Sequence, residues 1–185
     1  MRSLRIALVL LSLGFAGALA AIEVAGVPVP ETVSAEGKTL KLNGAGLRKK
    51  LLFKVYVAAL YVETPSKDGA AVIFSSGVKR VRLSILRSLK GSQVSEAISE
   101  GFERNSRDQM PKLEARLKKL ASMIPDVKEG DEIAFTWVPD KVIQIAVRGT
   151  DRGTIEGRDF GDALLSVWLG PNPVQEDLKK ALLGG

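Results

Sequence analysis

The stretch that most constrains the fold is Leu51–Val62, which is dominated by apolar residues and contains no glycine or proline. β-Branched and aromatic residues are frequent in it, and such a run is typical of a long strand buried on both faces. Side chains alternate between the two faces of a strand. We therefore expect one face to carry Lys54, Tyr56, Ala58 and Leu60, and the other to carry Phe53, Val55, Val57, Ala59 and Tyr61.

A glycine-rich segment and a basic cluster precede this strand. The residues 44–46, Gly-Ala-Gly, predict a turn or a close approach of another backbone, because glycine tolerates both. Arg48 follows, with Lys49 and Lys50 beside it. A turn that brings a fixed cation next to the phenol of Tyr56 is a candidate cradle for a small anion. The alternative is that the basic residues form a solvated loop and that Tyr56 is a core residue bonded to a backbone carbonyl.

Composition limits the chemistry that the chain can perform. Its 185 residues, 45% of them hydrophobic and 26% charged, suit one globular domain with a sizeable core. The sequence contains no cysteine and no histidine. This excludes disulfides, thiolate metal sites and every nucleophile that depends on a histidine base. We expect no metal site and no cofactor.

The first 20 residues have the pattern of a secretory signal peptide. Arg2 and Arg5 form a positive start, residues 6–13 an apolar core, and residues 18–20, Ala-Leu-Ala, a cleavage site. The alternative is an uncleaved anchor, but the apolar stretch is short for a membrane span. The predicted mature domain is 21–185, with no span left after cleavage. It would be exported, and periplasmic if the source is Gram-negative.

The charge balance gives little support to nucleic-acid binding. Removal of Arg2 and Arg5 would lower the formal net charge from +6 to +4, and the remaining surplus is spread along the chain. Basic residues are not interleaved with aromatic ones, and no nucleic-acid motif is present.

The rest of the chain predicts an α+β domain. Alternating patterns predict further strands, and 3.6-residue periodicity predicts helices in the middle and at the end. The expected strands cover 22–33, 39–43, 78–86, 130–137, 141–148 and 153–157, and the expected helices 66–74, 91–102, 111–124, 159–169 and 174–183. Strands dominate both halves, which favours a mostly antiparallel sheet covered by helices on one face.

Three motifs give the chain a resemblance to the chalcone isomerase-like family. They are GAGLR at 44–48, FKVYVAALYVE at 53–63, and GRDFGDALLSVWLG at 157–170 with PNP at 171–173. The resemblance implies an open-faced β-sandwich, in which the ligand lies between one large sheet and the helices that cover it. It also implies that Arg48 matches the arginine that holds the anion in plant enzymes that cyclise chalcones.

Other positions depart from the catalytic pattern. Tyr56 stands where catalytic members carry threonine, and Val94, Ala97 and Gly101 stand where they carry tyrosine, lysine and asparagine. Apolar groups cannot donate hydrogen bonds to a developing enolate. The pattern instead resembles the non-catalytic, fatty-acid-binding branch, in which an arginine and a strand tyrosine hold the carboxylate.

The resemblance therefore implies a ligand site made of Arg48, Tyr56, Val94, Ala97, Ile98 and Gly101. The first two residues would bind a carboxylate, and the helix residues would contact an acyl chain. Two other functions stay open at this point: a chalcone-type intramolecular lyase that uses Arg48, and an interaction module without a small ligand. The expected partner is a fatty acid or similar amphipathic carboxylate, and a protein partner is unknown.

Overall fold

The computed structural model describes residues 20–139 and 142–185. The predicted signal peptide falls on residues 1–20, of which 1–19 lie outside the described residues. Residues 140 and 141, at the turn predicted to follow Pro139, lie outside them as well. No helix within the described part of the chain is both long and apolar enough to span a bilayer.

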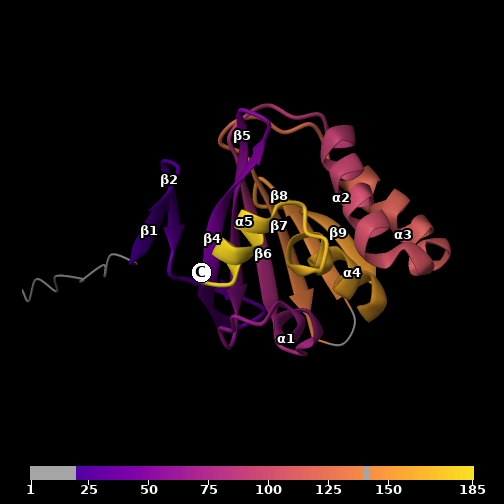
Figure 1. Cartoon of the computed structure of the whole chain (residues 1–185), viewed down its shortest axis with the longest axis horizontal. Helices are drawn as coiled ribbons and strands as arrows, with labels where there is room; N and C mark the ends of the chain where they lie inside the picture. Colours follow the sequence, from indigo (N-terminus) through magenta and orange to yellow (C-terminus); the bar gives the residue numbers. More distant parts are fainter. Residues whose placement is uncertain (1–19, 140–141) are drawn as a thin grey trace, which may run out of the picture.

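Seven antiparallel strands form one sheet whose spatial order follows the chain (Figure 1). They are β3 (Thr32–Ala35), β4 (Lys38–Lys50), β5 (Phe53–Val62), β6 (Lys79–Ile85), β7 (Glu132–Val138), β8 (Val142–Val147) and β9 (Thr150–Glu156). Two more strands, β1 (Ala21–Val24) and β2 (Val27–Pro30), form a separate hairpin. The predicted edge strand at 22–33 is therefore a hairpin followed by β3, because Ala25 and Gly26 turn the chain with positive φ.

The helices cover one side of the sheet (Figure 1). They are α1 (Gly69–Phe74), α2 (Gly91–Ser106), α3 (Met110–Met123), α4 (Arg158–Leu169) and α5 (Glu176–Leu182), with a short 3-10 turn at Arg107–Gln109. The hairpin of β1 and β2 lies on the other side, away from the helices. The predicted fold class, an α+β domain with an antiparallel sheet and helices on one face, is confirmed.

The alternation predicted for β5 separates two hydrophobic cores. Ala58 and Leu60 belong to the large core under the helices, and Tyr56 packs against it. Val57 and Tyr61 belong to the smaller core under the hairpin. The two-residue period thus holds from Tyr56 to Tyr61, as predicted.

The period fails near the start of β5. Arg48 pairs with Tyr56, but Lys49 pairs with Lys54, so Val55 is an extra residue in a β-bulge. A bulge changes the direction of the side chains beyond it, and Phe53 and Val55 line the same cavity as Tyr56. Their predicted placement on the opposite face is therefore wrong.

The glycines at 44 and 46 do not form a turn. Both lie inside β4, which continues to Lys50, and the chain turns at Leu51 and Leu52 instead. A Cβ atom on Gly44 would overlap the carbonyl oxygen of Ala181, and one on Gly46 would lie 2.7 Å from the Ala181 Cβ. These glycines are required because the backbone of α5 approaches the strand closely.

Candidate functional site

A cavity of about 350 Å³ lies between one end of the sheet and helices α2 and α4. Strands β4, β5, β6 and β7, the loop before α2, and the segment after α4 also contribute to it. Its lining consists of Arg48, Lys50, Leu51, Phe53, Val55, Tyr56, Leu83, Ile85, Arg87, Ser88, Leu89, Gln93, Val94, Ala97, Ile98, Glu100, Arg104, Ile133, Val167, Trp168 and Val174. The volume is within the usual range for small-molecule pockets, about 300–1,000 Å³.

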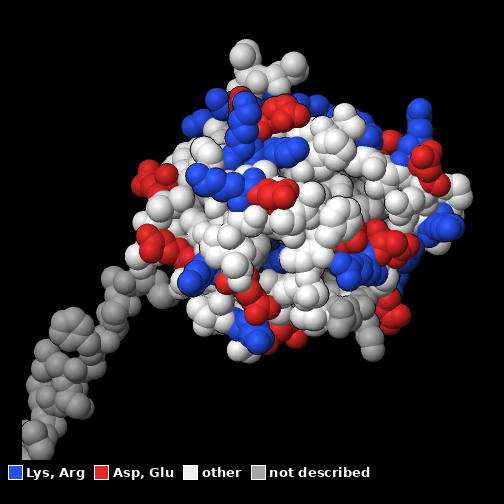
Figure 2. Space-filling view, turned by 60° about the horizontal axis from the view of Figure 1, so that its bottom comes forward, with Lys and Arg blue, Asp and Glu red and all other residues white. Residues whose placement is uncertain are grey.

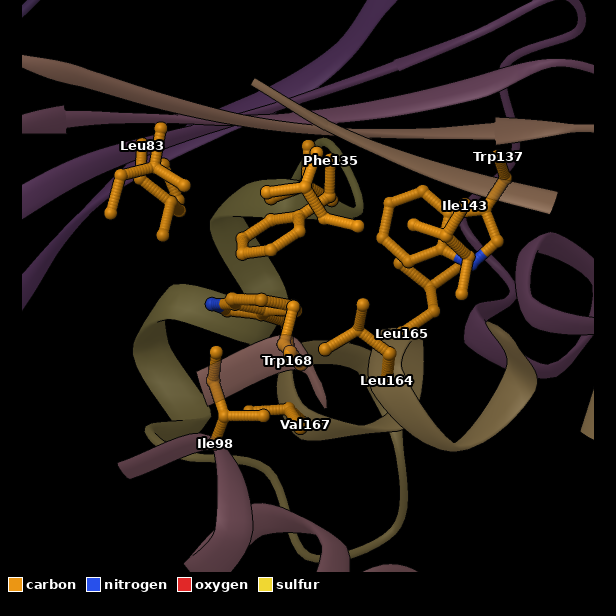
Figure 3. Close-up of a cluster of buried hydrophobic side chains, with 14 of the residues drawn as sticks. Leu83, Ile98, Phe135, Trp137, Ile143, Leu164, Leu165, Val167 and Trp168 are labelled. Carbon is orange, nitrogen blue, oxygen red and sulfur yellow. The ribbon is translucent and has the colours of Figure 1, made fainter. Parts of the chain in front are cut away.

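The inner wall of the cavity is apolar. Figure 3 shows Trp168 of α4 between Phe135 of the sheet on one side and Ile98 and Val167 on the other. The rings of Phe135 and Trp168 are tilted, with centroids 5.9 Å apart. Ile98 and Val167 are only 3% and 2% exposed, so the wall is a surface of the packed core rather than a mobile loop.

Tyr56 is the polar group at the centre of the site. Its hydroxyl accepts a hydrogen bond of 3.1 Å from the indole N–H of Trp168. Burial raises the pKa of the phenol, while the Trp168 bond and the nearby Arg48 guanidinium oppose the rise. Tyr56 is therefore protonated at neutral pH. A hydroxyl has one hydrogen to donate, and the bond from Trp168 leaves that hydrogen available to a third group.

Arg48 is held beside Tyr56 by the sheet and by the C-terminal segment. The two residues are direct partners across β4 and β5. Gln175 accepts from the Arg48 guanidinium at 3.2 Å and from the backbone N–H of Lys49 at 2.9 Å. The Gln175 side chain also donates to the carbonyl of Leu47 at 3.2 Å. Gln175 thus bridges three consecutive residues of β4 and fixes the direction of the arginine.

The mouth of the cavity has a positive balance of charge. Arg48, Lys50, Arg87 and Arg104 contribute cations, and Glu100 contributes one carboxylate. Among the described residues, none of these five takes part in a salt bridge. The Arg87 guanidinium lies over the ring of Phe53, 4.5 Å from its centroid. An anion that enters this mouth meets cations that are not already neutralised.

The structure brings together five of the six residues predicted for the site. Arg48, Tyr56, Val94, Ala97 and Ile98 line the cavity, and Gly101 does not. A Cβ atom on Gly101 would lie 2.8 Å from both methyl groups of Val167, so this glycine serves the close packing of α2 on α4. The structure therefore places Gly101 in the packing between α2 and α4 and not in the lining of the cavity.

Several residues of the site were missed by reasoning from the sequence. Trp168, Gln175, Arg87 and Arg104 were not singled out from the sequence. Only apolar residues and one glycine of α2 were considered there, but Gln93, Glu100 and Arg104 of this helix also line the cavity. The one available signal was Trp168, since the N–H of a buried tryptophan needs an acceptor.

Two other hollows lack this combination of an apolar wall and unpaired cations. One, of about 40 Å³, adjoins Lys79 and Trp137. The other, of about 700 Å³, is a wide and open depression in which Lys90 is paired with Asp126, and Arg148 with Asp131. We therefore take the cavity at Tyr56 as the candidate site.

Comparisons with known proteins agree with the fold described above. A sequence model of the family described as chalcone isomerase-like matches residues 21–184. No curated protein sequence matches the chain. A fatty-acid binding protein of Arabidopsis thaliana, AtFAP1, has a similar structure with a TM-score of 0.68 and 17% sequence identity. The match covers 85% of this chain and 92% of the plant protein, and at this identity it shows the fold alone.

Proposed function

The chain belongs to the chalcone isomerase-like family, and on that premise we propose that it binds a fatty acid or a similar amphipathic carboxylate without transforming it. The carboxylate lies at Arg48 and Tyr56. The acyl chain lies along the apolar wall formed by Ile98, Val167 and their neighbours. The AtFAP1 structure, whose name describes a fatty-acid binding protein, supports this ligand class as a relative of the same fold.

The observation that carries the proposal is the direction of the hydrogen bonds at Tyr56. Its hydroxyl accepts from Trp168, so its own hydrogen is free to donate into the cavity. The adjacent Arg48 offers a guanidinium, whose N–H groups bind a carboxylate in a fork. A neutral phenol and a cation on the same side of a pocket suit a ligand with a negative charge and several acceptor lone pairs.

The apolar wall supplies the free energy for a long chain. Burial of one methylene contributes about 0.8 kcal/mol. About a dozen methylenes would contribute roughly 10 kcal/mol before the cost of association is subtracted. Most of the affinity would therefore come from the chain, and the head-group residues would supply the preference for an acid.

Titrations with matched ligands test the assignment of the head group. A fatty acid and the fatty alcohol of the same length are titrated into the wild type, Arg48→Ala and Tyr56→Phe. Arg48→Ala should weaken binding of the acid by about 2–5 kcal/mol. Tyr56→Phe should weaken it by about 1.5–3 kcal/mol, and both should affect the alcohol less. The matched control is Arg152→Ala, on the exposed side of β9.

Equal binding of the acid by Arg48→Ala and the wild type would show that the head group lies elsewhere. Mass spectrometry of lipids that remain bound through native purification gives an independent result. An acyl carboxylate released from the wild type supports the proposal. A protein that carries no lipid and binds neither ligand would instead favour an interaction module.

The proposal that the protein is not an enzyme rests on Val94 and Ala97, which stand at two of the three α2 positions where catalytic members carry polar side chains. Val94 and Ala97 line the cavity and offer no hydrogen-bond donor to a developing enolate. Chalcone cyclisation in the presence of the protein should match the spontaneous rate. An acceleration that disappears in Arg48→Ala would establish the lyase alternative.

We also propose that the protein is exported and that residues 1–20 are removed. The first strand, β1, begins at Ala21, and the family match begins at the same residue. Cleavage there would leave the whole described domain intact. Intact-mass measurement of the protein recovered outside the cytoplasm tests this, and a product that retains Met1 contradicts it.

A further inference from the structure

The tip of the β4–β5 hairpin exposes three consecutive apolar side chains. Leu51, Leu52 and Phe53 are 89%, 97% and 57% exposed. Single exposed apolar residues are common on protein surfaces, but a contiguous group at a projecting turn is not. The tip lies at the upper end of the molecule in Figure 1, at the opposite end of β5 from α1.

The tip is also unfavourable for the isolated fold. Leu51 adopts a φ of 55°, a conformation that glycine or asparagine tolerates much better than leucine. Lys49 and Lys54 are direct cross-strand partners, so like charges face each other. Packing within the protein explains neither the positive φ of Leu51 nor the pairing of Lys49 with Lys54, since the side chains at this turn are exposed.

Basic residues surround the apolar tip. Arg48, Lys49, Lys50 and Lys54 lie within six residues of Leu51 or Leu52, and no acidic residue occurs between Gly37 and Val62. Figure 2 shows uncharged atoms projecting from the upper end of the molecule, with Lys and Arg atoms and some Asp and Glu atoms beneath them. The apolar residues of the tip are thus flanked by four basic residues, which we call the basic ring: Arg48, Lys49, Lys50 and Lys54.

The tip forms part of the mouth of the cavity. Lys50, Leu51 and Phe53 line the cavity as well as the turn, and Arg87 joins them from the neighbouring loop. A surface that covers the tip would therefore face the entrance through which a ligand reaches Tyr56.

We propose that this tip docks onto the surface of a lipid bilayer that contains anionic lipids. The leucines enter the boundary between head groups and acyl chains, and the lysines contact the phosphates. Apolar side chains beside flexible cations suit this boundary, because the long lysine stems can stay in the apolar layer while their ammonium groups reach the head groups. Docking places the cavity mouth at the membrane, and it does not depend on which ligand the cavity holds.

A tryptophan at the tip reports contact with the bilayer locally. The native Trp137 and Trp168 are only 6% and 2% exposed, so a new tryptophan at an exposed position can be distinguished from them. Leu52→Trp alters a residue that does not line the cavity. With vesicles of phosphatidylglycerol and phosphatidylcholine, its emission should shift to the blue and be quenched by brominated lipids. Vesicles of phosphatidylcholine alone should produce a much smaller response.

Phe74→Trp is the matched control for position. Phe74 is 60% exposed and lies in α1, at the far end of the molecule from the tip. Its emission should not change with either type of vesicle. An equal response from Phe74→Trp and Leu52→Trp would mean that contact is not made through the tip, and it would overturn the proposal.

Charge reversal tests the role of the basic ring. Added to Leu52→Trp, Lys54→Glu should lower the affinity for anionic vesicles about tenfold. Lys67→Glu, an exposed position in the loop before α1, should have little effect. Fatty-acid titrations of the same proteins without vesicles should be unchanged, so a failure to dock and a failure to bind the ligand give different results. Leu52→Trp emission that does not respond to anionic vesicles would overturn the proposal.

Discussion

The indole N–H of Trp168 donates to the hydroxyl of Tyr56 at 3.1 Å, although 112 positions separate the two residues in the chain. The bond joins the last turns of α4 to the middle of the sheet. It also orients the hydroxyl of Tyr56, the polar group at the centre of the site. A substitution of Trp168 should therefore change the affinity for the proposed carboxylate ligand through its effect on Tyr56.

A double-mutant cycle measures this coupling. In the wild type, Tyr56→Phe should weaken binding of a fatty acid by about 1.5–3 kcal/mol. In Trp168→Phe, where the indole N–H no longer orients the hydroxyl, the same change should cost less than half as much. Calorimetric titration of the four proteins gives the coupling energy. Strictly additive effects would show that Trp168 only packs against Tyr56.

Gln175 should act as a positioning residue for Arg48. Gln175→Leu removes the acceptor shared by the Arg48 guanidinium and the Lys49 N–H. We expect affinity for a fatty acid to fall by about 1 kcal/mol, the usual contribution of a hydrogen bond, with affinity for the matched alcohol unchanged. Gln109→Leu, at the exposed 3-10 turn before α3, is the control. A loss that is equal for acid and alcohol would indicate a general disturbance of the cavity.

Lys79 should make stability depend on pH in the alkaline range. Its ammonium group donates to the carbonyls of Val72, Ile73 and Ser75, which close the end of α1. Burial lowers the pKa of Lys79 from its ordinary value of 10.5 to about 8. Between these pH values the unfolded chain holds the proton and the folded protein does not. The free energy of unfolding therefore rises with pH in this window, by on the order of 3 kcal/mol from this residue.

Urea unfolding of the wild type and Lys79→Met from pH 7.5 to 10.5 checks this sign. The difference in unfolding free energy between wild type and variant should increase toward high pH. Burial raises the pKa of the Tyr56 and Tyr61 phenols, so both favour the folded state less as the pH rises beyond 10. This loss is common to both proteins and cancels in the difference. Parallel stability curves would contradict the prediction.

Gly44 should be intolerant of any side chain. Gly44→Ala places a methyl group against the backbone of Ala181, and α5 must shift to admit it. We expect a loss of about 1–3 kcal/mol in unfolding free energy, as for an overpacked core. Gly77→Ala is the control, because its methyl group would contact a side chain, the Glu63 carboxylate at 3.3 Å, and not the backbone of a helix. Equal, small losses from the two changes would mean that α5 is not held tightly against β4.

The parts of the fold that sequence could predict are those set by local patterns. The two-residue period of β5 separates the two cores correctly from Tyr56 to Tyr61, because each side chain needs only its own strand to fix its face. The helix at 111–124 is equally visible, since Leu113, Leu117 and Leu120 recur on one side and all three are buried. Hydrophobic periodicity carries this information without knowledge of the partner element.

The errors concern contacts between distant segments. Gly44 permits a turn and also permits close approach of a helix, and only the position of α5, far along the chain, decides between them. Gly101 could face a ligand or permit close packing of a helix, and its closeness to Val167 favours packing. At the site, Arg48 and Tyr56 were found because they flank one hairpin. Trp168 and Gln175 come from the C-terminal part of the chain, and no local pattern pairs them with β4 or β5.

The bridge from Gln175 to Arg48 has a consequence for the order in which the protein assembles. The strands of the sheet pair in chain order, so most of the sheet can form while the chain is still being synthesised. Arg48 is made early, but Gln175, the residue that holds it, is only ten positions from Gly185. The contact that fixes the direction of Arg48 is therefore among the last to form, because it needs the segment that follows α4. Until that segment is in place, Arg48 lies in a paired strand without the side chain that orients it.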